Sequence, residues 1–454
     1  MTDNTLVRML PDYMPASLIF NLFHAEDGAV FLDSSSGSPS ERYSIIGLNP
    51  YLCLVQKDGQ LSINGTPSQE NFSCCLTRLL HEGRQENPTS LPLVAGAIGY
   101  FSYDYGIGLE NFRSRHGKDP DVPDCIWNFY DNFIIEDLTE RKIYITGNGM
   151  LEPAECSITG IERKLAWGID VENPATESVD PCGGIVPDFE KTEYADTVQK
   201  LIDYIIEGDV YIANLTQRFL IKSSLHPYDF FRRLRRQTPS PFGGYMNYGD
   251  FQIVSASPES FLSLRNGTVT TRPIKGTRKR GATPAEDLAL RLELENSEKD
   301  RSELLMIVDL ERNDLNRICL DNTVRVNDLF RVEEHSSVFH LTAEISGRLK
   351  PGITVMDLIR AAFPGGSITG APKIRAIEII DELERTGRGI YTGSMGYISL
   401  SGDCELNIII RTAICKNGHY HLGAGGGVTC ESDPDFEHEE TLLKAGSVIR
   451  PLTF

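Results

Sequence analysis

The sequence lacks any long apolar stretch. Its longest apolar runs are short, such as ELLMIV at 303–308, whereas a membrane-spanning helix needs about 20 predominantly apolar residues. The first ten residues, MTDNTLVRML, contain no basic segment followed by an apolar stretch, so no secretory signal is indicated. We therefore expect a cytoplasmic protein that has no membrane partner.

Cysteine is present, but not in a pattern that binds a metal or builds a disulfide framework. The ten cysteines are scattered along the chain, only Cys74 and Cys75 are close together, and no CxxC pair exists. We expect reduced and mostly buried thiols, as in a cytosolic protein.

Positive charge is scarce, because 44 Lys and Arg residues stand against 64 Asp and Glu residues and give a net charge of -20. This balance argues against nucleic acid as a partner, and an anionic substrate would need local positive charge. The stretch TRPIKGTRKRG (271–281) supplies five basic residues. Lys275 differs from the other four because it follows a strand-like run and lies between an apolar residue and a Gly-Thr pair.

The chain has 454 residues, enough for more than one folding unit. Residues 1–170 alternate short predicted strands with turns. Residues 171–188 are rich in Pro, Gly and acidic residues and form the predicted linker. Residues 189–454 contain both helices and hairpin strands, and this clustering predicts an α+β fold with antiparallel sheets. Helical spacing and capping residues predict helices at 191–207, from 283, at 297–315 and from 434.

The last of these helices carries Glu437, Glu440 and Lys444 three and four residues apart, on one face. An earlier helix repeats the acidic spacing with Asp300 and Glu303. Two such helices together could hold one hard cation, and Mg²⁺ suits carboxylate and water ligands. The alternative is ordinary surface charge, because acids near a helix start favour the macrodipole.

Two segments offer main-chain N–H groups to an anion. The stretch HLGAGGGVT (421–429) follows a predicted strand and is either an anion-binding loop or a flexible turn. It matches neither a Walker loop nor a dinucleotide fingerprint. The second segment places Ser367, Thr369 and Lys373 before a predicted helix, and it is either an anion site or an ordinary helix start.

Three single residues are candidates for chemistry. Glu259 in SASPESF is either a solvated acid or a catalytic one, and His340 in VFHLTAEISG is either a core histidine or a base. Arg411 lies in a predicted strand at 405–415. An arginine in a buried strand requires an anion, which is either an internal acid or a substrate carboxylate.

Together these motifs resemble the chorismate-utilising enzymes, which include component I of anthranilate synthase and of aminodeoxychorismate synthase, isochorismate synthase and salicylate synthase. From about residue 189 onwards, the family order is matched by SASPE, RPIKGTRKRG, ELLMIVDLERND, VFHLTAEISG, PGGSITGAPK, YTGSMGYIS, LNIIIRTA, GAGGGV and DPDFEHEETLLKA. The resemblance implies a four-layer α+β fold in which two mainly antiparallel β-sheets pack together and are flanked by helices.

Within the family, the residue at Lys275 separates two reactions. Anthranilate synthases typically carry a small residue there, whereas the PIKGT form resembles component I of aminodeoxychorismate synthase. The resemblance implies amination of chorismate at C4 to 4-amino-4-deoxychorismate, in the para-aminobenzoate branch of folate biosynthesis. Lys275 would add to ring carbon C2, and Glu259 would protonate the departing hydroxyl group. The alternatives are the anthranilate synthase reaction and, more distantly, a non-catalytic regulator.

The resemblance also implies a cofactor and a substrate site. Mg²⁺ would be held by Glu303 and Glu440 directly, with Asp300 and Glu437 nearby and some contacts made through water. The implied substrate-binding residues are Gly276, Thr277, His340, Ser367, Tyr391, Arg411, Gly425, Gly426, Gly427 and Lys444.

The N-terminal region, with FLDS and ERYSIIG, resembles the tryptophan pocket of the amination subunits. The implied pocket residues are Asp33, Ser34, Pro239, Ser240, Pro241 and Phe242, with Asp33 in place of the family glutamate. The implied partners are chorismate and a class I glutaminase subunit that supplies ammonia, because none of the ten cysteines lies in the GxCxG setting of a glutaminase nucleophile.

Overall fold

The computed structural model describes residues 5–37, 42–168, 184–335 and 338–453. Within these ranges all strands belong to one hydrogen-bonded network, and every pairing between them is antiparallel. The strands are β1 (Leu6–Met9), β2 (Val30–Asp33), β3 (Tyr43–Lys57), β4 (Gln60–Ile63), β5 (Thr66–Ser68), β6 (Gly96–Phe101), β7 (Cys125–Asp137), β8 (Lys142–Gly147), β9 (Ile185–Pro187), β10 (Ile212–Lys222), β11 (Phe242–Asn247), β12 (Phe251–Ser257), β13 (Ser260–Arg265), β14 (Thr268–Arg272), β15 (Ile274–Lys279), β16 (Arg325–Glu334), β17 (Val338–Arg348), β18 (Gly370–Ala371), β19 (Ser394–Ser399), β20 (Cys404–Asn407), β21 (Thr412–Lys416) and β22 (His419–Val428).

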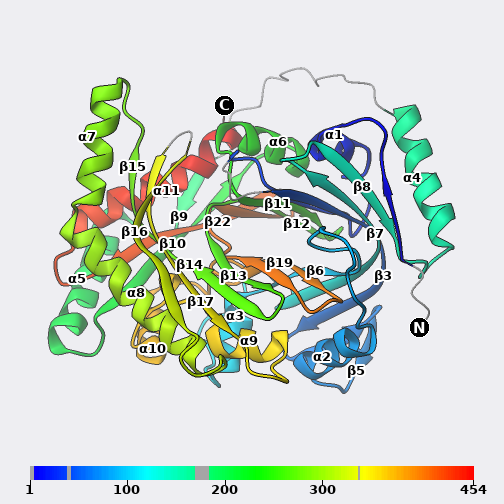
Figure 1. Cartoon of the computed structure of the whole chain (residues 1–454). Helices are drawn as coiled ribbons and strands as arrows, with labels where there is room; N and C mark the ends of the chain where they lie inside the picture. Colours follow the sequence, from blue (N-terminus) through cyan, green and yellow to red (C-terminus); the bar gives the residue numbers. More distant parts are fainter. Residues whose placement is uncertain (1–4, 38–41, 169–183, 336–337, 454) are drawn as a thin grey trace.

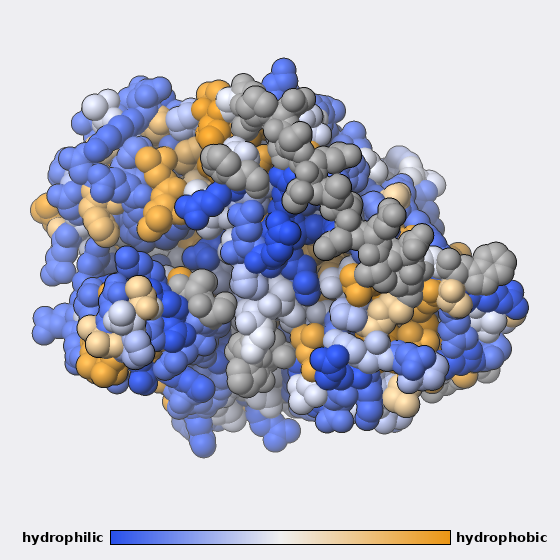
Figure 2. Space-filling view, turned by 90° about the horizontal axis from the view of Figure 1, so that it is seen from above, coloured by the Kyte–Doolittle hydropathy of each residue, from blue (hydrophilic) through white to orange (hydrophobic). Residues whose placement is uncertain are grey.

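The helices lie on the outside of this network (Figure 1). They are α1 (Ala16–Ile19), α2 (Phe72–Glu82), α3 (Tyr103–Leu109), α4 (Ala154–Gly168), α5 (Lys191–Glu207), α6 (Pro227–Gln237), α7 (Pro284–Glu295), α8 (Glu298–Asn316), α9 (Val355–Ala362), α10 (Lys373–Leu383) and α11 (Pro434–Thr453), with two 3-10 turns, η1 (Phe20–Leu22) and η2 (Gly366–Ile368). None of the helices in the described part of the chain has the length and apolarity needed to span a membrane. Hydrophilic residues dominate the face seen in Figure 2, and apolar residues form separate patches on it.

The network divides into two arms at β3 and β7, the longest pair of strands. The two strands pair along almost their whole length, from Tyr43 opposite Asp137 to Gln56 opposite Cys125. The first arm continues from β3 through β2, β11, β12, β21 and β22 to β10. The second arm continues from β7 through β6, β19, β20, β13 and β14 to β17, which also pairs with β15 and β16.

Alternating side chains place the two arms face to face. On β12 of the first arm, Ile253 belongs to the core between the arms and Val254 to an outer core under α6 and α11. On β6 of the second arm, Tyr100 belongs to the core between the arms and Phe101 to an outer core under α2, α8 and α9. This period-two alternation produces four layers, helices on each outer face and two sheets between them, so the predicted α+β four-layer fold is confirmed.

Both predicted regions contribute strands to both arms, since β2 pairs with β11 and β6 with β19. The predicted linker, 171–188, lies outside the described residues as far as 183. Its last part forms β9, which pairs with β10.

The predicted helices of the C-terminal region are confirmed, and their ends follow local capping chemistry. Gly208 ends α5 in a left-handed conformation with φ of 89°. Thr283 and Ser297 each accept a hydrogen bond from a main-chain N–H three residues later and begin α7 and α8. Helices α5, α7, α8 and α11 gather on one side of the molecule, opposite α4 (Figure 1), so the two acid-bearing helices α8 and α11 lie together.

Candidate active site

Lys275 lies on β15, and a β-bulge directs its side chain. Along the β15–β17 pair the register shifts between Lys275 and Thr277, which leaves Gly276 as the extra residue with φ of 70°. A Cβ at Gly276 would lie 2.8 Å from Cγ of Asp300 on α8, so only glycine permits both this conformation and this close approach. The Nζ of Lys275 donates a hydrogen bond of 3.2 Å to the carbonyl oxygen of Ser367.

Lysines stand between the acids of α8 and those of α11. Lys299 Nζ lies 3.9 Å from Oε1 of Glu303 and 3.7 Å from Oε1 of Glu437, so it joins the two helices. Lys444 pairs with Oε1 of Glu440 at 2.9 Å. Across the described ranges, no three His, Cys, Asp or Glu side chains converge closely enough to form a metal site as they stand.

Charge and burial set the protonation of this acid cluster, which comprises Glu303, Glu437 and Glu440. Burial raises the pKa of Glu303 and of Glu437. At Glu440 burial acts in the same direction, but the ammonium of Lys444 outweighs it and the pKa is lowered. The Oε2 atom of Glu437 is buried and has no hydrogen-bond partner, an arrangement that is costly unless a ligand satisfies it. The cluster therefore offers carboxylate oxygens, one of which has no hydrogen-bond partner, and such oxygens are ligands that suit Mg²⁺.

The fourth predicted metal residue, Asp300, is engaged elsewhere. Its main-chain N–H donates to the Ser297 hydroxyl at the start of α8, and one carboxylate oxygen accepts a 3.1 Å hydrogen bond from Arg278. Asp300 therefore borders the acid cluster and supports β15 through Arg278.

Glu259 lies in the short connection between β12 and β13 and is only 5% exposed. Burial raises the pKa of its carboxyl group, against the opposing effects of the Ser367 hydroxyl, which hydrogen-bonds it, and of the Lys275 ammonium. The same two residues, Ser367 and Lys275, are themselves hydrogen-bonded to each other. The predicted nucleophile and the predicted acid are thus neighbours, and the solvated alternative for Glu259 is excluded.

The glycine-rich stretch 421–429 is not a loop, so this part of the prediction is wrong. Its glycines belong to β22, which pairs along its whole length with β10. A Cβ at Gly427 would lie 3.3 Å from Lys275 Nζ and 3.8 Å from Glu303 Oε2, and a Cβ at Gly426 would lie 3.1 Å from Glu437 Oε2. The glycines therefore keep open the space that the lysine and the acids face.

The main chain of β22 nonetheless offers N–H groups to this space. On β10, two main-chain N–H groups do not bond to β22. The N–H of Asn214 donates to the carbonyl oxygen of Thr369, and the N–H of Thr216 donates to the buried carboxylate of Glu384. Gly427 lies opposite Asn214 and Gly425 opposite Thr216. Hydrogen-bonded and non-hydrogen-bonded pairs alternate along an antiparallel ladder, and these two pairs are non-hydrogen-bonded. Both glycines therefore point their N–H and C=O groups away from β10. Consistent with this direction, Lys444 Nζ donates to the Gly425 carbonyl at 2.9 Å. Strand β21 pairs only with the first four residues of β22, so this edge is open.

Arg411 also departs from the predicted strand. Strand β20 ends at Asn407 and β21 begins at Thr412, because the N–H of Ile408 donates to the carbonyl of Glu259 and turns the chain. Arg411 has φ of 48°, a strained conformation for a residue with a side chain. Burial lowers the pKa of its guanidinium, and no acidic side chain of the described residues opposes that effect. No acidic partner of Arg411 is found among the described residues, so a substrate carboxylate stays the predicted anion.

His340 faces Thr277 across the β15–β17 pair, with Nδ1 3.0 Å from the threonine hydroxyl. Burial, with the nearby charge of Arg411 and the ring of His335, lowers the pKa of His340 to about 3. The histidine is therefore neutral at neutral pH and suited to hydrogen bonding.

A buried ion pair that the sequence analysis missed holds the turn η2, which carries Ser367. Arg388 pairs with Glu384 at 2.7 Å, and both side chains are at most 5% exposed. Arg388 also donates to the carbonyl oxygens of Ile368, at 2.7 Å, and Asn214, at 2.6 Å. The i,i+4 spacing of Glu384 and Arg388 is visible in the sequence, but the two carbonyl partners are not.

The second predicted anion site, at the start of α10, is an internal contact. Lys373 is buried and pairs with Asp314 of α8 at 2.7 Å, and it also donates to the carbonyl oxygen of Ala362. The Thr369 hydroxyl donates to the carbonyl oxygen of Gly365. Lys373 and Thr369 therefore hold the loop in place, and of this trio only Ser367 faces Lys275.

Tyr391 packs against β22 beside the open edge. A Cβ at Gly423 would lie 2.3 Å from the Tyr391 ring, so the glycine makes room for the aromatic face. Burial raises the pKa of the Tyr391 hydroxyl above its usual range, so the phenol stays protonated and able to donate.

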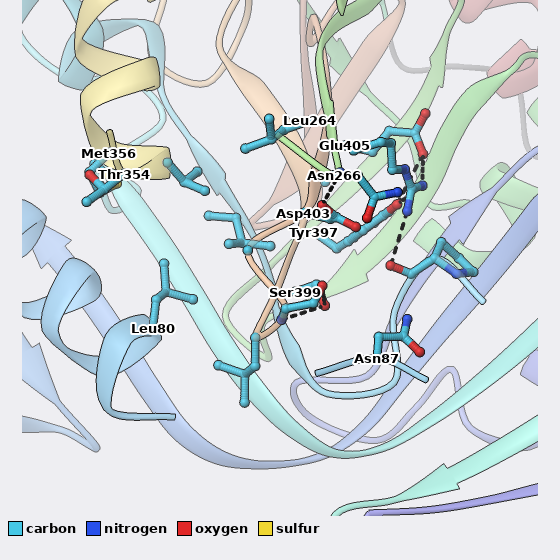
Figure 3. A pocket seen from close by; sticks show the side chains of 18 of the residues that line it. Leu80, Asn87, Leu264, Asn266, Thr354, Met356, Tyr397, Ser399, Asp403 and Glu405 are labelled. Atoms are coloured by element: carbon cyan, nitrogen blue, oxygen red, sulfur yellow. Dashed lines mark hydrogen bonds and ion pairs between the residues drawn. The ribbon is translucent and has the colours of Figure 1, made fainter. Parts of the chain in front are cut away.

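The predicted tryptophan pocket borders a separate cavity of about 1800 Å³. Asp33, Ser34, Pro241 and Phe242 line it, and in the described part of the chain none of the predicted catalytic or metal residues does. Figure 3 shows the far part of this cavity, where Tyr397 of β19, Glu405 of β20 and Asp403 of the connection between them face Leu80 of α2 and Met356 of α9.

Three of the predicted pocket residues already have internal partners. Asp33 accepts a 2.8 Å hydrogen bond from Arg235, and the Ser34 hydroxyl contacts the carbonyl oxygens of Tyr43 and Pro241. Ser240 bonds to Ser35 on the same rim. Tryptophan binding in this cavity stays a prediction.

Comparisons with known proteins identify relatives of this chain. Residues 31–450 match the family model described as chorismate binding enzyme. The chain is 37% identical over 435 residues to aminodeoxychorismate synthase component 1 of Bacillus subtilis (strain 168), covering 93% of this chain and 91% of the relative. It is 34% identical over 464 residues to anthranilate synthase component 1 of Acetivibrio thermocellus, covering 96% and 92%. Among solved structures, anthranilate synthase component I from Streptococcus pneumoniae TIGR4 superposes with a TM-score of 0.79 at 34% identity, over 90% of this chain and 93% of that one.

Proposed function

Because the chain belongs to the chorismate-binding enzyme family, we propose that it aminates chorismate at C4 and forms 4-amino-4-deoxychorismate. The observation that carries this proposal is the position of Lys275. Its Nζ faces the same point of β22 as Glu303 Oε2, and it neighbours the buried Glu259. A lysine there can occupy C2 of the ring before ammonia does, and so direct ammonia to C4.

The proposed reaction has two displacement steps. In the first, the neutral amine of Lys275 forms a bond to C2, the ring double bonds shift, and the C4–O bond breaks as Glu259 donates its proton, so that water leaves. In the second, ammonia forms a bond to C4, the double bonds shift back, and the C2–N bond to Lys275 breaks with its electron pair going to the lysine nitrogen. The new C4 ammonium then returns a proton to Glu259. The raised pKa of Glu259 supports its role as the proton donor.

The substrate carboxylates need partners of opposite charge. Arg411, whose charge no described acid balances, and the outward N–H groups of Gly425 and Gly427 are suited to the enolpyruvyl carboxylate. Tyr391 and Lys444 border the same edge. Fixing both ends of the substrate converts a collision into a positioned reaction.

We also propose that Glu303 and Glu440, with Glu437 and Asp300 beside them, hold Mg²⁺. Bound there, Mg²⁺ would neutralise the ring carboxylate and withdraw electron density from the diene. The buried, unpartnered Oε2 of Glu437 supports this role.

The anthranilate synthase reaction is the second candidate, and His340 is the observation that favours it. In that reaction ammonia adds at C2 and pyruvate is eliminated, a step that needs a base. The pKa of about 3 makes His340 neutral and available as an acceptor, but it also makes the histidine a weak base.

Ammonia is the proposed nitrogen donor, delivered by a glutaminase subunit. The similar proteins are named component 1, which supports a second component, and no cysteine of this chain lies in a glutaminase-type motif. Ammonium salts at high pH should replace the subunit, since free ammonia is the species that reacts.

The test is product analysis with chorismate, Mg²⁺ and ammonium at pH 8.5. The proposal predicts 4-amino-4-deoxychorismate without pyruvate release. Fluorescent anthranilate with stoichiometric pyruvate would instead establish the second candidate.

A further inference from the structure

Lys299 occupies a position that the proposed reaction does not explain. It projects from the first turn of α8 and lies between Glu303 of the same helix and Glu437 of α11. Its ammonium also lies 6.0 Å from the ring centroid of Phe436 on α11. Lys299 is therefore the cation that links the two acid-bearing helices.

We propose that Lys299 is a built-in counterion of the acid cluster, which stabilises the cluster without metal and is displaced when a divalent cation binds between α8 and α11. This role of Lys299 rests on the metal site of the proposed function.

Without a neighbouring cation, the buried acids Glu303 and Glu437 destabilise the folded protein. Glu303 is 8% exposed and Glu437 is 1% exposed. Two carboxylates brought together at such low exposure repel each other and lose hydration, and this is costly unless a cation lies between them. Lys299, 3.9 Å from Glu303 and 3.7 Å from Glu437, supplies that cation.

The contacts of Lys299 with the two carboxylates are loose. At 3.7 and 3.9 Å, both Lys299–carboxylate distances exceed those of hydrogen bonds. The lysine side chain is 38% exposed, so it can rotate into solvent without unpacking the helices. By contrast, Lys373 contacts Asp314 at 2.7 Å with both side chains at most 8% exposed, the geometry of a permanent internal pair.

When a divalent cation binds between α8 and α11, it replaces the ammonium of Lys299 as the positive charge beside the acids. A divalent cation brings twice the charge of an ammonium and coordinates oxygens directly at about 2.1 Å. A monovalent cation offers no such gain over the ammonium already present. Lys299 should therefore weaken Mg²⁺ binding while making the metal-free protein more stable.

Lys191 provides a matched control. It too contacts two acids of α11, Asp435 at 3.2 Å and Glu439 at 3.9 Å, but it is 53% exposed and its partners are at least 69% exposed. A lysine that acts only as a surface partner of α11 should behave like Lys191.

The experiment compares wild type, Lys299→Met, Lys299→Arg and Lys191→Met, without chorismate. Melting temperatures are measured in EDTA, and Mg²⁺ affinity is measured by isothermal titration calorimetry. We expect Lys299→Met to melt at lower temperature in EDTA and to bind Mg²⁺ about fivefold or more tightly than wild type. Lys299→Arg, which keeps the charge, and Lys191→Met should match wild type in both measurements.

Two results would overturn the inference. Equal Mg²⁺ affinities of Lys299→Met and wild type, with equal melting temperatures in EDTA, would make Lys299 an ordinary surface lysine while leaving the metal site intact. The absence of Mg²⁺ binding by every variant would remove the metal site and the inference with it. That result differs from the first, and it would leave product analysis as the test of the amination reaction.

Discussion

The Nζ of Lys275 donates a hydrogen bond of 3.2 Å to the carbonyl oxygen of Ser367. The hydroxyl of the same serine hydrogen-bonds Glu259, so one residue contacts both proposed catalytic groups. The turn that carries Ser367 is itself held by the guanidinium of Arg388, which donates to the next carbonyl along the chain. Nucleophile and acid are therefore positioned by one turn that a buried ion pair fixes in place.

Replacing Lys275 with alanine should abolish covalent capture of the substrate. Wild-type protein incubated with chorismate and Mg²⁺ without ammonia should gain the mass of chorismate less water, since the lysine adds as the C4 hydroxyl leaves. The variant should show no adduct, and its C4 amination should fall on the order of 100-fold or more, the effect of losing a positioned catalytic group. Intact-protein mass spectrometry and product chromatography measure the two effects.

Lys279→Ala is the control for this variant, because Lys279 lies on the same strand and is exposed. It should retain both the adduct and the rate. Undiminished formation of 4-amino-4-deoxychorismate by Lys275→Ala would remove the proposed role of the lysine.

Replacing Glu259 with glutamine should remove the fall of kcat at high pH. Burial raises the pKa of Glu259, so the carboxyl group keeps its proton to higher pH than an exposed glutamate, and the rate should fall as pH rises through that pKa. Glutamine cannot donate a proton, so kcat should drop by about 10²- to 10⁴-fold, with the chorismate KM little changed. The measurement is kcat from pH 5.5 to 9; an unchanged profile in the variant would contradict the assignment.

Arg411→Gln should separate stability from binding. Wild-type Arg411 is partly buried, and no acid of the described residues balances its charge, so removing the charge should raise the melting temperature in the absence of substrate. The same change should raise the chorismate KM by about 10- to 100-fold, the range for a lost charge-assisted hydrogen bond. A variant that loses stability and keeps its KM would show instead that Arg411 serves the fold.

Local signals predicted much of this structure from the sequence. The capping residues and 3.6-residue spacing of α5, α7, α8 and α11 are encoded within each segment. The same spacing placed Glu303, Glu437 and Glu440 on faces that could meet. These predictions depend on neighbours in sequence, and the structure confirms the helices.

Non-local pairing decided the parts that the sequence did not reveal. Glycine has low β-propensity, so Gly425 to Gly427 became a strand only because β10 pairs with them. The turn before Arg411 depends on a hydrogen bond from Ile408 to Glu259, residues far apart in the chain. Lys299 is at i,i+4 spacing from Glu303, but its contact with Glu437 appears only when α8 and α11 pack together.

Glu311 is a buried acid that the proposed reaction does not use. It lies on α8, is 8% exposed, and accepts a 2.9 Å hydrogen bond from the Thr271 hydroxyl. Burial raises its pKa from 4.5 to about 8, helped by the nearby charges of Glu259 and Asp314. The folded protein therefore binds a proton that the unfolded chain releases between pH 4.5 and about 8.

The sign of the effect follows from this difference. The stabilising contribution of the bound proton is complete below pH 4.5 and is lost as pH rises to about 8, so wild-type stability should fall across that range. Glu311→Gln keeps the shape and the hydrogen bond to Thr271 without the titration. Its advantage over wild type should grow from near zero at pH 5 to as much as about 4 kcal/mol at pH 8, since each pKa unit corresponds to about 1.4 kcal/mol. Urea denaturation at both pH values measures it, with Asp309→Asn, an exposed acid of the same helix, as control. An equal difference at the two pH values would show that Glu311 is already ionised in the folded protein.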